Sequence, residues 1–570
     1  MRTHEQDAKT LRPSWPFTGR EDELELVRAA SAAGRPGVVV TGPAGHGKTR
    51  LLAEAVRGTE HARVTGTPQA RGLPFAAFAH LLPDTVSLHR AVRTLSGVRL
   101  LVVDDAHLLD EASAALLHQL AAHGRTRLVV TAVDGETAPG AVSRLWTGDL
   151  LPRLALEPLH REDVARLLAP AGLEPLTVRR LHHVCRGDLR LLRDLVAALG
   201  PAGRLVPVPG TDQRAWRGAL PLTPAVRECL APVLERSGPG EREVLERLAF
   251  AEPLPLPLDD FDLDVLERLE TDGLIHLDDR AGSVALAHPL HGPALRATAG
   301  RLRARRLAGA PVDHGSALAA EERALRRRIG QLDVRPVATP VGEWLVAQGA
   351  VLPAGYAAVR ARFARLRGEV RDAAAWAREG LRGVPEHAGC RAELVLAEGE
   401  SGEQSLGDDV YSRYDAVRLG APGRVAGRLP AGSVFARHAD ALARGDADGL
   451  DGAAEALQER GFVLFAAEAR AQAVRAHRDP RAARVSRTRA VALARRCQGA
   501  RTPALAGLVL SELTARQRQV VTLAAAGLSN REIAERLTLS VRTVGNHLYS
   551  AYTRLGTGDR GALPWLCESA

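Results

Sequence analysis

The chain has 570 residues, too many for one hydrophobic core, so we expect several domains. Its apolar fraction of 45% and charged fraction of 25% are ordinary for folded, soluble protein. A net charge of +9 spread over this length does not by itself indicate nucleic-acid binding.

Cysteine usage and hydropathy argue against secretion and membrane insertion. The cysteines are odd in number, far apart and never in a C-x-x-C pair, which disfavours a disulfide framework or a zinc site. They are Cys185, Cys229, Cys390, Cys497 and Cys567. The N-terminus lacks the apolar core of a signal peptide, and no apolar run is long enough to span a bilayer. We expect a cytoplasmic protein.

A glycine-rich loop follows the first predicted strand, residues 37–41, and precedes a helix predicted from Lys48. It satisfies G-x-x-x-x-G-K-[ST], in which backbone N–H groups surround phosphate oxygens. Lys48 is one of two lysines among 76 basic residues, and its ammonium can reach the β- and γ-phosphates. The alternative is a chance glycine-rich turn. The pattern predicts ATP binding by Gly42, Gly45, His46, Gly47, Lys48, Thr49 and Arg50.

Two carboxylates end the next buried strand, residues 99–103. Asp104 is expected to hold Mg²⁺ together with the Thr49 hydroxyl, and Asp105 is the candidate catalytic residue that polarises an attacking water. A helix at 112–122 and a further strand at 127–131 continue the alternation of a parallel sheet.

The head, residues 14–200, resembles the ATPase module of the large ATP-binding regulators of the LuxR family, within the STAND branch of P-loop NTPases. Residues 17–24 match that family's opening hGRexEl segment, and residues 145–168 match its lid entry. The resemblance implies that Arg20 lies near the nucleotide base and His288 near its phosphates.

Two positions depart from the family pattern. Val133 stands where an arginine often senses the γ-phosphate, and Gly187-Asp188-Leu189 replaces the glycine-asparagine-proline of the lid. The expected activity is at most a slow ATPase used as a switch.

The middle of the chain is predicted to be largely helical. Proline-rich breaks from Pro201 to Pro224 suggest a linker, followed by a helical and winged-helix segment within 201–310. Residues 311–500 form an α-helical, repeat-like region, and the helix pair over 356–385 resembles a tetratricopeptide unit. Such pairs stack into a surface that binds an inducer or a partner protein, and an irregular bundle acting as a spacer is the alternative.

An arginine cluster precedes the last domain, with no acidic residue inside it. A phosphate backbone would bind such a patch, and the solvated face of a helix is the alternative. The arginines are Arg481, Arg484, Arg487, Arg489, Arg495, Arg496 and Arg501.

Three helices are predicted in the C-terminal domain, residues 508–570. Thr514 is the expected N-cap of the first, which ends at Gly527. Ser529 and Glu532 have capping-box spacing at the start of the second, residues 530–537. A third helix, about 542–555, would enter the major groove of DNA.

Residues 527–534, 539–547 and 554–556 are similar to the LuxR-type helix-turn-helix. The resemblance implies a fourth helix at 560–566 that makes a dimer contact, and a helical bundle without DNA affinity is the alternative. Gly545 stands where relatives often carry a long polar side chain, which would reduce direct readout. The implied phosphate contacts are Ser529, Asn530, Arg531, Thr543, His547 and Arg554, and the implied base-facing residues are Gly545, Asn546 and Tyr549, with Arg542 also in the DNA-binding set.

The sequence therefore predicts a multidomain regulator: an α/β P-loop NTPase head, a helical and winged-helix segment, a helical repeat-like middle and an all-α helix-turn-helix. We expect a transcription activator that uses ATP and Mg²⁺, binds double-stranded promoter DNA and RNA polymerase, and forms a homo-oligomer under control of an inducer. The alternatives are a DNA-docked ATPase and a protein-binding signalling scaffold.

Overall fold

The computed structural model describes residues 15–32, 34–83, 87–251, 254–255, 261–278, 283–307, 314–398, 409–425, 427–511, 515–537 and 539–555. The chain divides into two compact units, Met1–Gly309 and Ala310–Ala570. Among the described residues, no helix is both long enough and apolar enough to cross a membrane.

The first unit contains a five-stranded parallel sheet in the order β2-β3-β4-β1-β5. Its strands are β1 (Gly37–Gly42), β2 (Ala62–Thr65), β3 (Leu100–Asp104), β4 (Arg127–Val133) and β5 (Arg153–Ala155). The three strands predicted from the sequence correspond to β1, β3 and β4, which the structure confirms. Because β4 lies between β1 and β3, the carboxyl ends of all three strands meet at one edge of the sheet.

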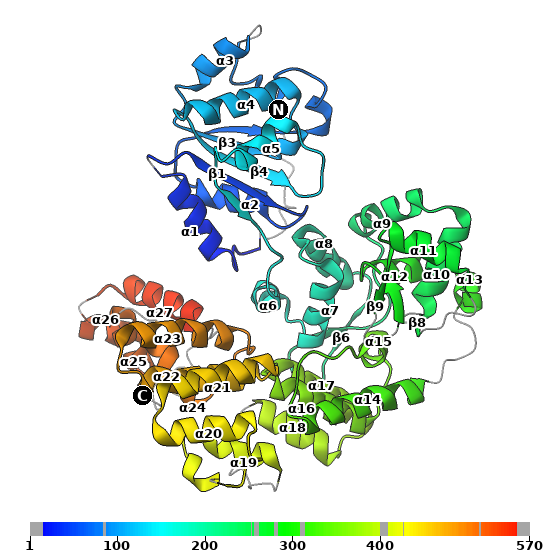
Figure 1. Cartoon of the computed structure of the whole chain (residues 1–570), viewed down its shortest axis with the longest axis vertical. Helices are drawn as coiled ribbons and strands as arrows, with labels where there is room; N and C mark the ends of the chain where they lie inside the picture. Colours follow the sequence, from blue (N-terminus) through cyan, green and yellow to red (C-terminus); the bar gives the residue numbers. More distant parts are fainter. Residues whose placement is uncertain are drawn as a thin grey trace, which may run out of the picture. The chain divides into compact units, whose positions relative to one another are not determined.

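Helices cover both faces of this sheet, as Figure 1 shows. One face packs against α1 (Glu21–Ala30) and α2 (Lys48–Ala55), and the other packs against α3 (Leu88–Leu95), α4 (Glu111–His123) and α5 (Gly140–Thr147). Side chains alternate along β1: Val38 and Val40 join the first core and Val39 the second. Strands buried on both faces explain the continuous apolar runs in the sequence.

The rest of the first unit is helical, with two small antiparallel sheets. Its elements are α6 (Arg161–Leu168), α7 (Pro175–Cys185), α8 (Leu189–Leu199), β6 (Leu205–Pro207), β7 (Arg214–Trp216), α9 (Pro224–Arg236), α10 (Pro239–Ala251), β8 (Leu254–Pro255), α11 (Leu263–Thr271), β9 (Ile275–Asp278), β10 (Ser283–Leu286), α12 (His291–Thr298) and α13 (Arg301–Leu307). One hydrophobic core joins α6 to α12 and includes residues of β7, β9 and β10. The proline-rich stretch expected as a linker belongs to this core, since β6 pairs with β7 and Trp216 is buried.

The second unit is helical throughout its described residues. Its helices are α14 (His314–Gly330), α15 (Pro340–Gln348), α16 (Ala354–Leu366), α17 (Val370–Gly383), α18 (Ala388–Glu398), α19 (Val410–Arg418), α20 (Val434–Arg444), α21 (Ala447–Glu459), α22 (Val463–Ala476), α23 (Pro480–Arg495), α24 (Pro503–Ser511), α25 (Ala515–Ala525), α26 (Asn530–Leu537) and α27 (Val541–Leu555). The predicted helix pair over 356–385 corresponds to α16 and α17, which pack together. Its tetratricopeptide character stays a prediction.

Aromatic stacking and a buried ion pair hold the middle of the second unit together. The rings of Tyr414 and Phe435 stack with centroids 4.0 Å apart. Next to them, the Arg418 guanidinium donates to both carboxylate oxygens of the buried Glu468, at 2.7 and 3.0 Å. Arg418 also donates to Asp415 at 2.7 Å. Such bidentate pairs are strong when both partners are present.

We expect Glu468→Gln to lower the free energy of unfolding of the second unit by about 3 kcal/mol, because it removes the charge that compensates a buried guanidinium. Because Arg418 still pairs with Asp415, we expect a loss at the low end of the roughly 3–5 kcal/mol that breaking a buried ion pair costs. Thermal unfolding of the full chain measures the effect. The control is Glu322→Gln, which removes the exposed pair with Arg326 and costs less than about 1 kcal/mol. Equal losses in the two variants would contradict the expectation.

Candidate functional site

The loop from Gly42 to Thr49 connects β1 to α2 at the carboxyl edge of the sheet. Its backbone turns sharply because Gly45 and Gly47 adopt φ of 77° and 87°, a region that disfavours side chains. Gly47 is the N-cap of α2, so the loop ends at the positive end of a helix dipole. Free backbone N–H groups at such a position attract anions. We call this segment the Gly42–Thr49 loop.

Lys48 is buried beneath this loop, with 5% of its surface exposed. Its ammonium donates to the carbonyl oxygens of Gly42 and Pro43, at 2.8 and 2.7 Å. Burial lowers the pKa of Lys48, which the carboxylates of Asp105 and Asp104 partly offset. The carbonyl dipoles of Gly42 and Pro43 therefore stabilise the ammonium at the start of the loop.

Asp104 lies at the end of β3 and joins three neighbouring elements. Its Oδ1 accepts hydrogen bonds from the hydroxyls of Thr131, at 2.7 Å, and Thr49, at 3.1 Å. Its Oδ2 accepts from the Arg63 guanidinium at 3.1 Å. The structure thus brings together Thr49 and Asp104, the two residues predicted to hold a metal ion.

Asp105 follows Asp104 with a left-handed backbone, φ 51°. Its N–H donates to the Thr131 hydroxyl at 2.8 Å, which fixes the turn. Partial burial and the adjacent Asp104 raise the pKa of Asp105. A carboxyl group with a raised pKa is a better proton acceptor than an ordinary one, which is what the predicted role requires.

His46 lies within the loop and is buried, with 4% of its surface exposed. Its Nδ1 lies 3.0 Å from the carbonyl oxygen of Ala44, and burial lowers its pKa. The buried Nε2 has no hydrogen-bond partner among the described residues. Gly187 approaches this atom so closely that a Cβ there would lie 2.8 Å from it. A neutral imidazole with an unused buried nitrogen therefore faces the start of α8.

Arg20 and Arg50, both predicted to contact nucleotide, have different surroundings. Arg20 is buried, pairs with Glu23 at 2.6 Å and donates to the carbonyl oxygen of Glu157. Its charge helps to lower the pKa of His46, so it lies near the loop. Arg50 is exposed on α2 and pairs with Glu54 at 3.2 Å.

His288 lies in a cluster of histidine and arginine side chains, together with His183, Arg186 and His291. Its ring lies 5.2 Å from that of His291, centroid to centroid. Burial, and then the charges of His291, Arg186 and His183, lower the pKa of His288 to about 4. Arg186 immediately precedes Gly187, so this group is linked to the Gly42–Thr49 loop through the turn before α8.

The sequence patterns did not identify Thr131 and Arg63 as members of this site. Each is a polar residue within a strand adjoining β3, and this is the signal that could have found them. Val133 stands where the family pattern often has an arginine. Its backbone N–H donates to Nδ1 of the buried His107 at 3.4 Å.

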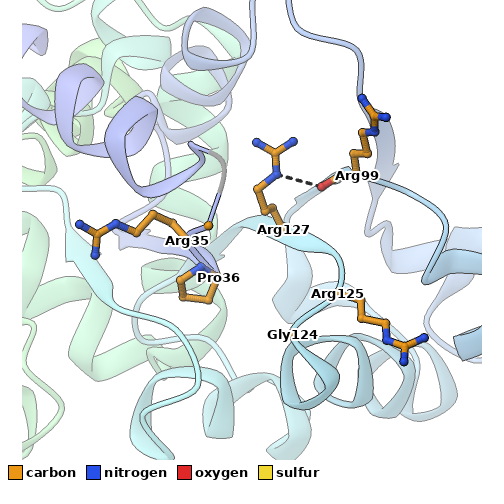
Figure 2. Close-up of a pocket in the computed structure, with 7 residues that line it drawn as sticks. Arg35, Pro36, Arg99, Gly124, Arg125 and Arg127 are labelled. Carbon is orange, nitrogen blue, oxygen red and sulfur yellow. Dashed lines mark hydrogen bonds between the residues drawn. The ribbon is translucent and has the colours of Figure 1, made fainter.

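A separate pocket of about 440 Å³ lies at the opposite, amino-terminal edge of the sheet. It is lined by Gly34, Arg35, Pro36, Arg99, Gly124, Arg125 and Arg127. In Figure 2 the guanidinium groups of Arg35 and Arg125 point in opposite directions, and Arg127 donates to the carbonyl oxygen of Arg99 at 3.1 Å. Because the donors diverge, we assign no ligand to this pocket.

The second candidate site is the three-helix domain of α25, α26 and α27. These helices share a small core of Val520, Val521, Ala524, Ile533, Ala534, Val544, Leu548 and Ala551. The predicted capping box is confirmed: Glu532 N–H donates to Ser529 Oγ at 3.3 Å, and Ser529 N–H donates to the Glu532 carboxylate at 2.6 Å. The predicted cap Thr514 and the predicted helix 560–566 lie outside the described residues.

α27 presents one exposed face and buries the other. Val544 and Leu548 point into the core, whereas Arg542, Asn546 and Tyr549 lie on the outer side, Tyr549 exposed by 76%. Helical spacing places Gly545 on the same outer face. This is the arrangement that a helix needs to enter a major groove.

The residues predicted to contact phosphates lie at the start of α26 and along α27. Ser529 and Arg531 lie at the start of α26 with Asn530, while Thr543 and His547 lie on α27. Ser540 caps α27 by accepting from the Thr543 N–H at 3.0 Å. Arg554 lies in α27, but its side chain is outside the described residues.

Comparisons with known proteins identify this domain. Residues 511–563 match the family model GerE, described as bacterial regulatory proteins of the luxR family. The chain is 42% identical over 78 residues to "Putative HTH-type transcriptional regulator Mb0914c" of Mycobacterium bovis, which is 14% of this chain and 9% of that protein. It is 49% identical over 51 residues to "Putative HTH-type transcriptional regulator YhjB" of Escherichia coli, 9% of this chain and 26% of that protein.

The C-terminal end of the chain therefore carries a LuxR-type helix-turn-helix, a match that supports DNA binding by this domain. The chain spans less than a tenth of the mycobacterial relative and about a quarter of the E. coli protein in these matches.

We expect Gly45→Ala to destabilise the first unit by about 1 kcal/mol more than Gly58→Ala. Both glycines have a left-handed backbone, φ 77° and 78°, so both variants lose about 1–2 kcal/mol to backbone strain. Only at Gly45 would the new Cβ meet Asp188, at 2.1 Å, and Asp188 caps α8. Thermal unfolding of the two variants gives the difference, and equal losses would show that the loop does not pack closely on the α8 cap.

Proposed function

We propose that this chain is an ATP-binding transcription regulator whose binding to promoter DNA is switched by nucleotide and by an inducer. The observation that carries the proposal is the presence, in one chain, of a LuxR-type helix-turn-helix and of a glycine-rich loop with a buried lysine. The loop and the helix-turn-helix lie in different compact units. Nucleotide would therefore affect DNA binding by shifting the populations of the chain's conformations.

The groups around the Gly42–Thr49 loop fit a triphosphate. The loop ends at a helix N-terminus, and Lys48 supplies a buried ammonium. His46 Nε2, a buried nitrogen without a partner among the described residues, would donate to a phosphate oxygen only after taking up a proton, because Nδ1 already faces the Ala44 carbonyl. A triphosphate would accept hydrogen bonds from the loop amides and from Lys48 in exchange for the carbonyls that now hold it.

Mg²⁺ fits the same edge of the sheet. Thr49 Oγ1 and Asp104 Oδ1 lie 3.1 Å apart, and both are the hard oxygen ligands that Mg²⁺ prefers. When bound, the ion would neutralise phosphate charge. Thr131 and Arg63 would position Asp104 for this task, and Asp105 would orient a water molecule. The valine at position 133, in place of a γ-phosphate-sensing arginine, favours slow turnover, so that ATP acts mainly as a switch.

DNA recognition is assigned to the outer face of α27. Asn546 would contact base edges, for which its amide suits adenine. Arg531 and Ser529, at the start of α26, would contact phosphates, and such contacts position the domain without reading sequence. Dimerisation and contact with RNA polymerase belong to the same proposal.

Lys48→Ala is expected to abolish ATP binding and to weaken nucleotide-dependent promoter binding, because the loop then lacks its ammonium. Calorimetric titration of Mg-ATP measures the first effect and fluorescence anisotropy of a promoter duplex the second. Arg57→Gln, which removes an exposed charge just beyond α2, is the control and should resemble wild type. Loss of ATP binding by a variant that binds promoter as tightly as ATP-loaded wild type would contradict the switch.

Asn546→Ala is expected to cost about 1–3 kcal/mol against the preferred base at one position of the site and to leave binding to random duplex unchanged. Arg531→Gln is the matched comparison, since removing a phosphate-binding guanidinium weakens binding to all duplexes alike. Binding to a selected duplex and to random duplex distinguishes them. The assignment fails if Asn546→Ala weakens both duplexes equally.

A further inference from the structure

The arginine cluster ahead of the helix-turn-helix forms the outer face of α23. Its buried face consists of Ser486, Ala490 and Leu493. The arginines from 481 to 496 lie away from this buried face, and they are Arg481, Arg484, Arg487, Arg489, Arg495 and Arg496. Helical spacing sets Arg481, Arg484 and Arg495 directly opposite the buried face, with the others on its flanks. We call this surface the α23 arginine face.

Little of this charge is neutralised within the protein. Arg489 pairs with Glu455 at 3.1 Å, and the other five have no acidic partner within 4.0 Å among the described residues. The helix cannot neutralise itself, because residues 480–511 contain no acid. Asp479, just before it, is occupied as the N-cap and accepts from the N–H groups of Arg481 and Ala482.

In two other helices of the same unit, an arginine pairs with an acidic residue of its own helix. On α14, Arg326 pairs with Glu322 at 2.6 Å, and on α17, Arg382 pairs with Glu379 at 2.6 Å. On α23, by contrast, like charges stand three residues apart, a spacing that destabilises an isolated helix. An unneutralised row of this kind is suited to a partner that supplies a row of negative charges.

The α23 arginine face lies close to the DNA-binding domain. α24 packs against α23 and also against α27, the helix that carries Asn546 and Tyr549 on its outer side. Because packed helices lie about 8–10 Å apart, the axes of α23 and α27 are within about 20 Å of each other near α24. The α23 arginine face and the helix proposed to read DNA are therefore close neighbours within one compact unit.

We propose that the α23 arginine face binds the phosphate backbone of the duplex beside the segment read by α27. The inference rests on the proposed DNA-binding function. The 16 residues of α23 extend about 24 Å, the rise of about seven base pairs, so several arginines can engage phosphates at once. Guanidinium groups suit this partner because they bind phosphate oxygens in a bidentate manner.

These contacts would add affinity without sequence preference. The three-helix domain itself has few net positive charges: residues 511–570 hold seven arginines and five acids. The α23 arginine face would therefore supply much of the electrostatic attraction, and the outer face of α27 the selectivity.

The test uses the full chain and the triple variant Arg481→Gln, Arg484→Gln, Arg495→Gln. Its control is a triple on α14, Arg323→Gln, Arg326→Gln, Arg327→Gln, which removes the same number of exposed positive charges from the same unit. The probes are a duplex selected by wild type from a random library and a random duplex of equal length. Their dissociation constants are measured by anisotropy as salt is varied.

We expect the α23 triple to lower the slope of log K against log salt by about 0.9 for each phosphate that the variant no longer neutralises, hence by up to about 2.7. The change in Kd between about 50 and 200 mM salt then shrinks by up to about 40-fold. Both duplexes should be affected alike, so the ratio of their affinities is kept. The α14 triple should retain the wild-type slope.

A second comparison localises the contact. With a duplex trimmed to the segment protected by α27, the two triples should bind alike. With flanks extended by about one helical turn, roughly 10 base pairs, the α23 triple should become weaker than the control. Thermal unfolding checks that both triples stay folded.

Equal salt slopes for the two triples, with wild type still preferring the selected duplex, would overturn this inference and leave the proposed function intact. Failure of wild type to prefer any selected duplex over random duplex would overturn both.

Discussion

The head of this protein depends on one consequence of parallel strand order: the ends of β1, β3 and β4 meet at one edge of the sheet. That edge gathers a buried ammonium, Lys48, and a buried carboxylate, Asp104. Removing charges from water is costly unless each finds polar partners. The structure meets this requirement with loop carbonyls for Lys48 and with two hydroxyls and Arg63 for Asp104. Lys48 and Asp104 are the groups to which we propose that a triphosphate and Mg²⁺ bind.

Towards the other end of the chain, the described residues of the helix-turn-helix share a core of eight buried side chains, and caps fix where α26 and α27 begin. Fixed helix starts matter because the proposed phosphate contacts use residues near those starts, while base contacts use the outer face of α27. Because this domain and the Gly42–Thr49 loop belong to different compact units, any influence of one on the other must be a coupling free energy between two sites.

Local patterns in the sequence predicted the local structure well, and tertiary partners poorly. The buried runs at β1, β3 and β4, and the second helix at 530–537, were recognisable because strand burial and capping are short-range properties. Thr131 and Arg63 are recognisable in the sequence as polar residues within strands, but linking them to Asp104 also required the strand order, which local periodicity does not give. The proline-rich stretch before α9 suggested a linker, because prolines in linkers, turns and edge strands look alike in sequence. In the structure this stretch forms a hairpin, and Trp216 in it is buried. The roles in ATP and DNA binding stay predictions.

The central claim, that nucleotide and promoter act on one conformational equilibrium, is tested most directly by reciprocity. The Kd for Mg-ATP is measured on the purified chain with and without saturating promoter duplex, and the Kd for duplex with and without saturating Mg-ATP. Thermodynamic linkage predicts that both constants change by the same factor, and that this factor differs from one. ATP and duplex that bind without altering each other's Kd would contradict the account.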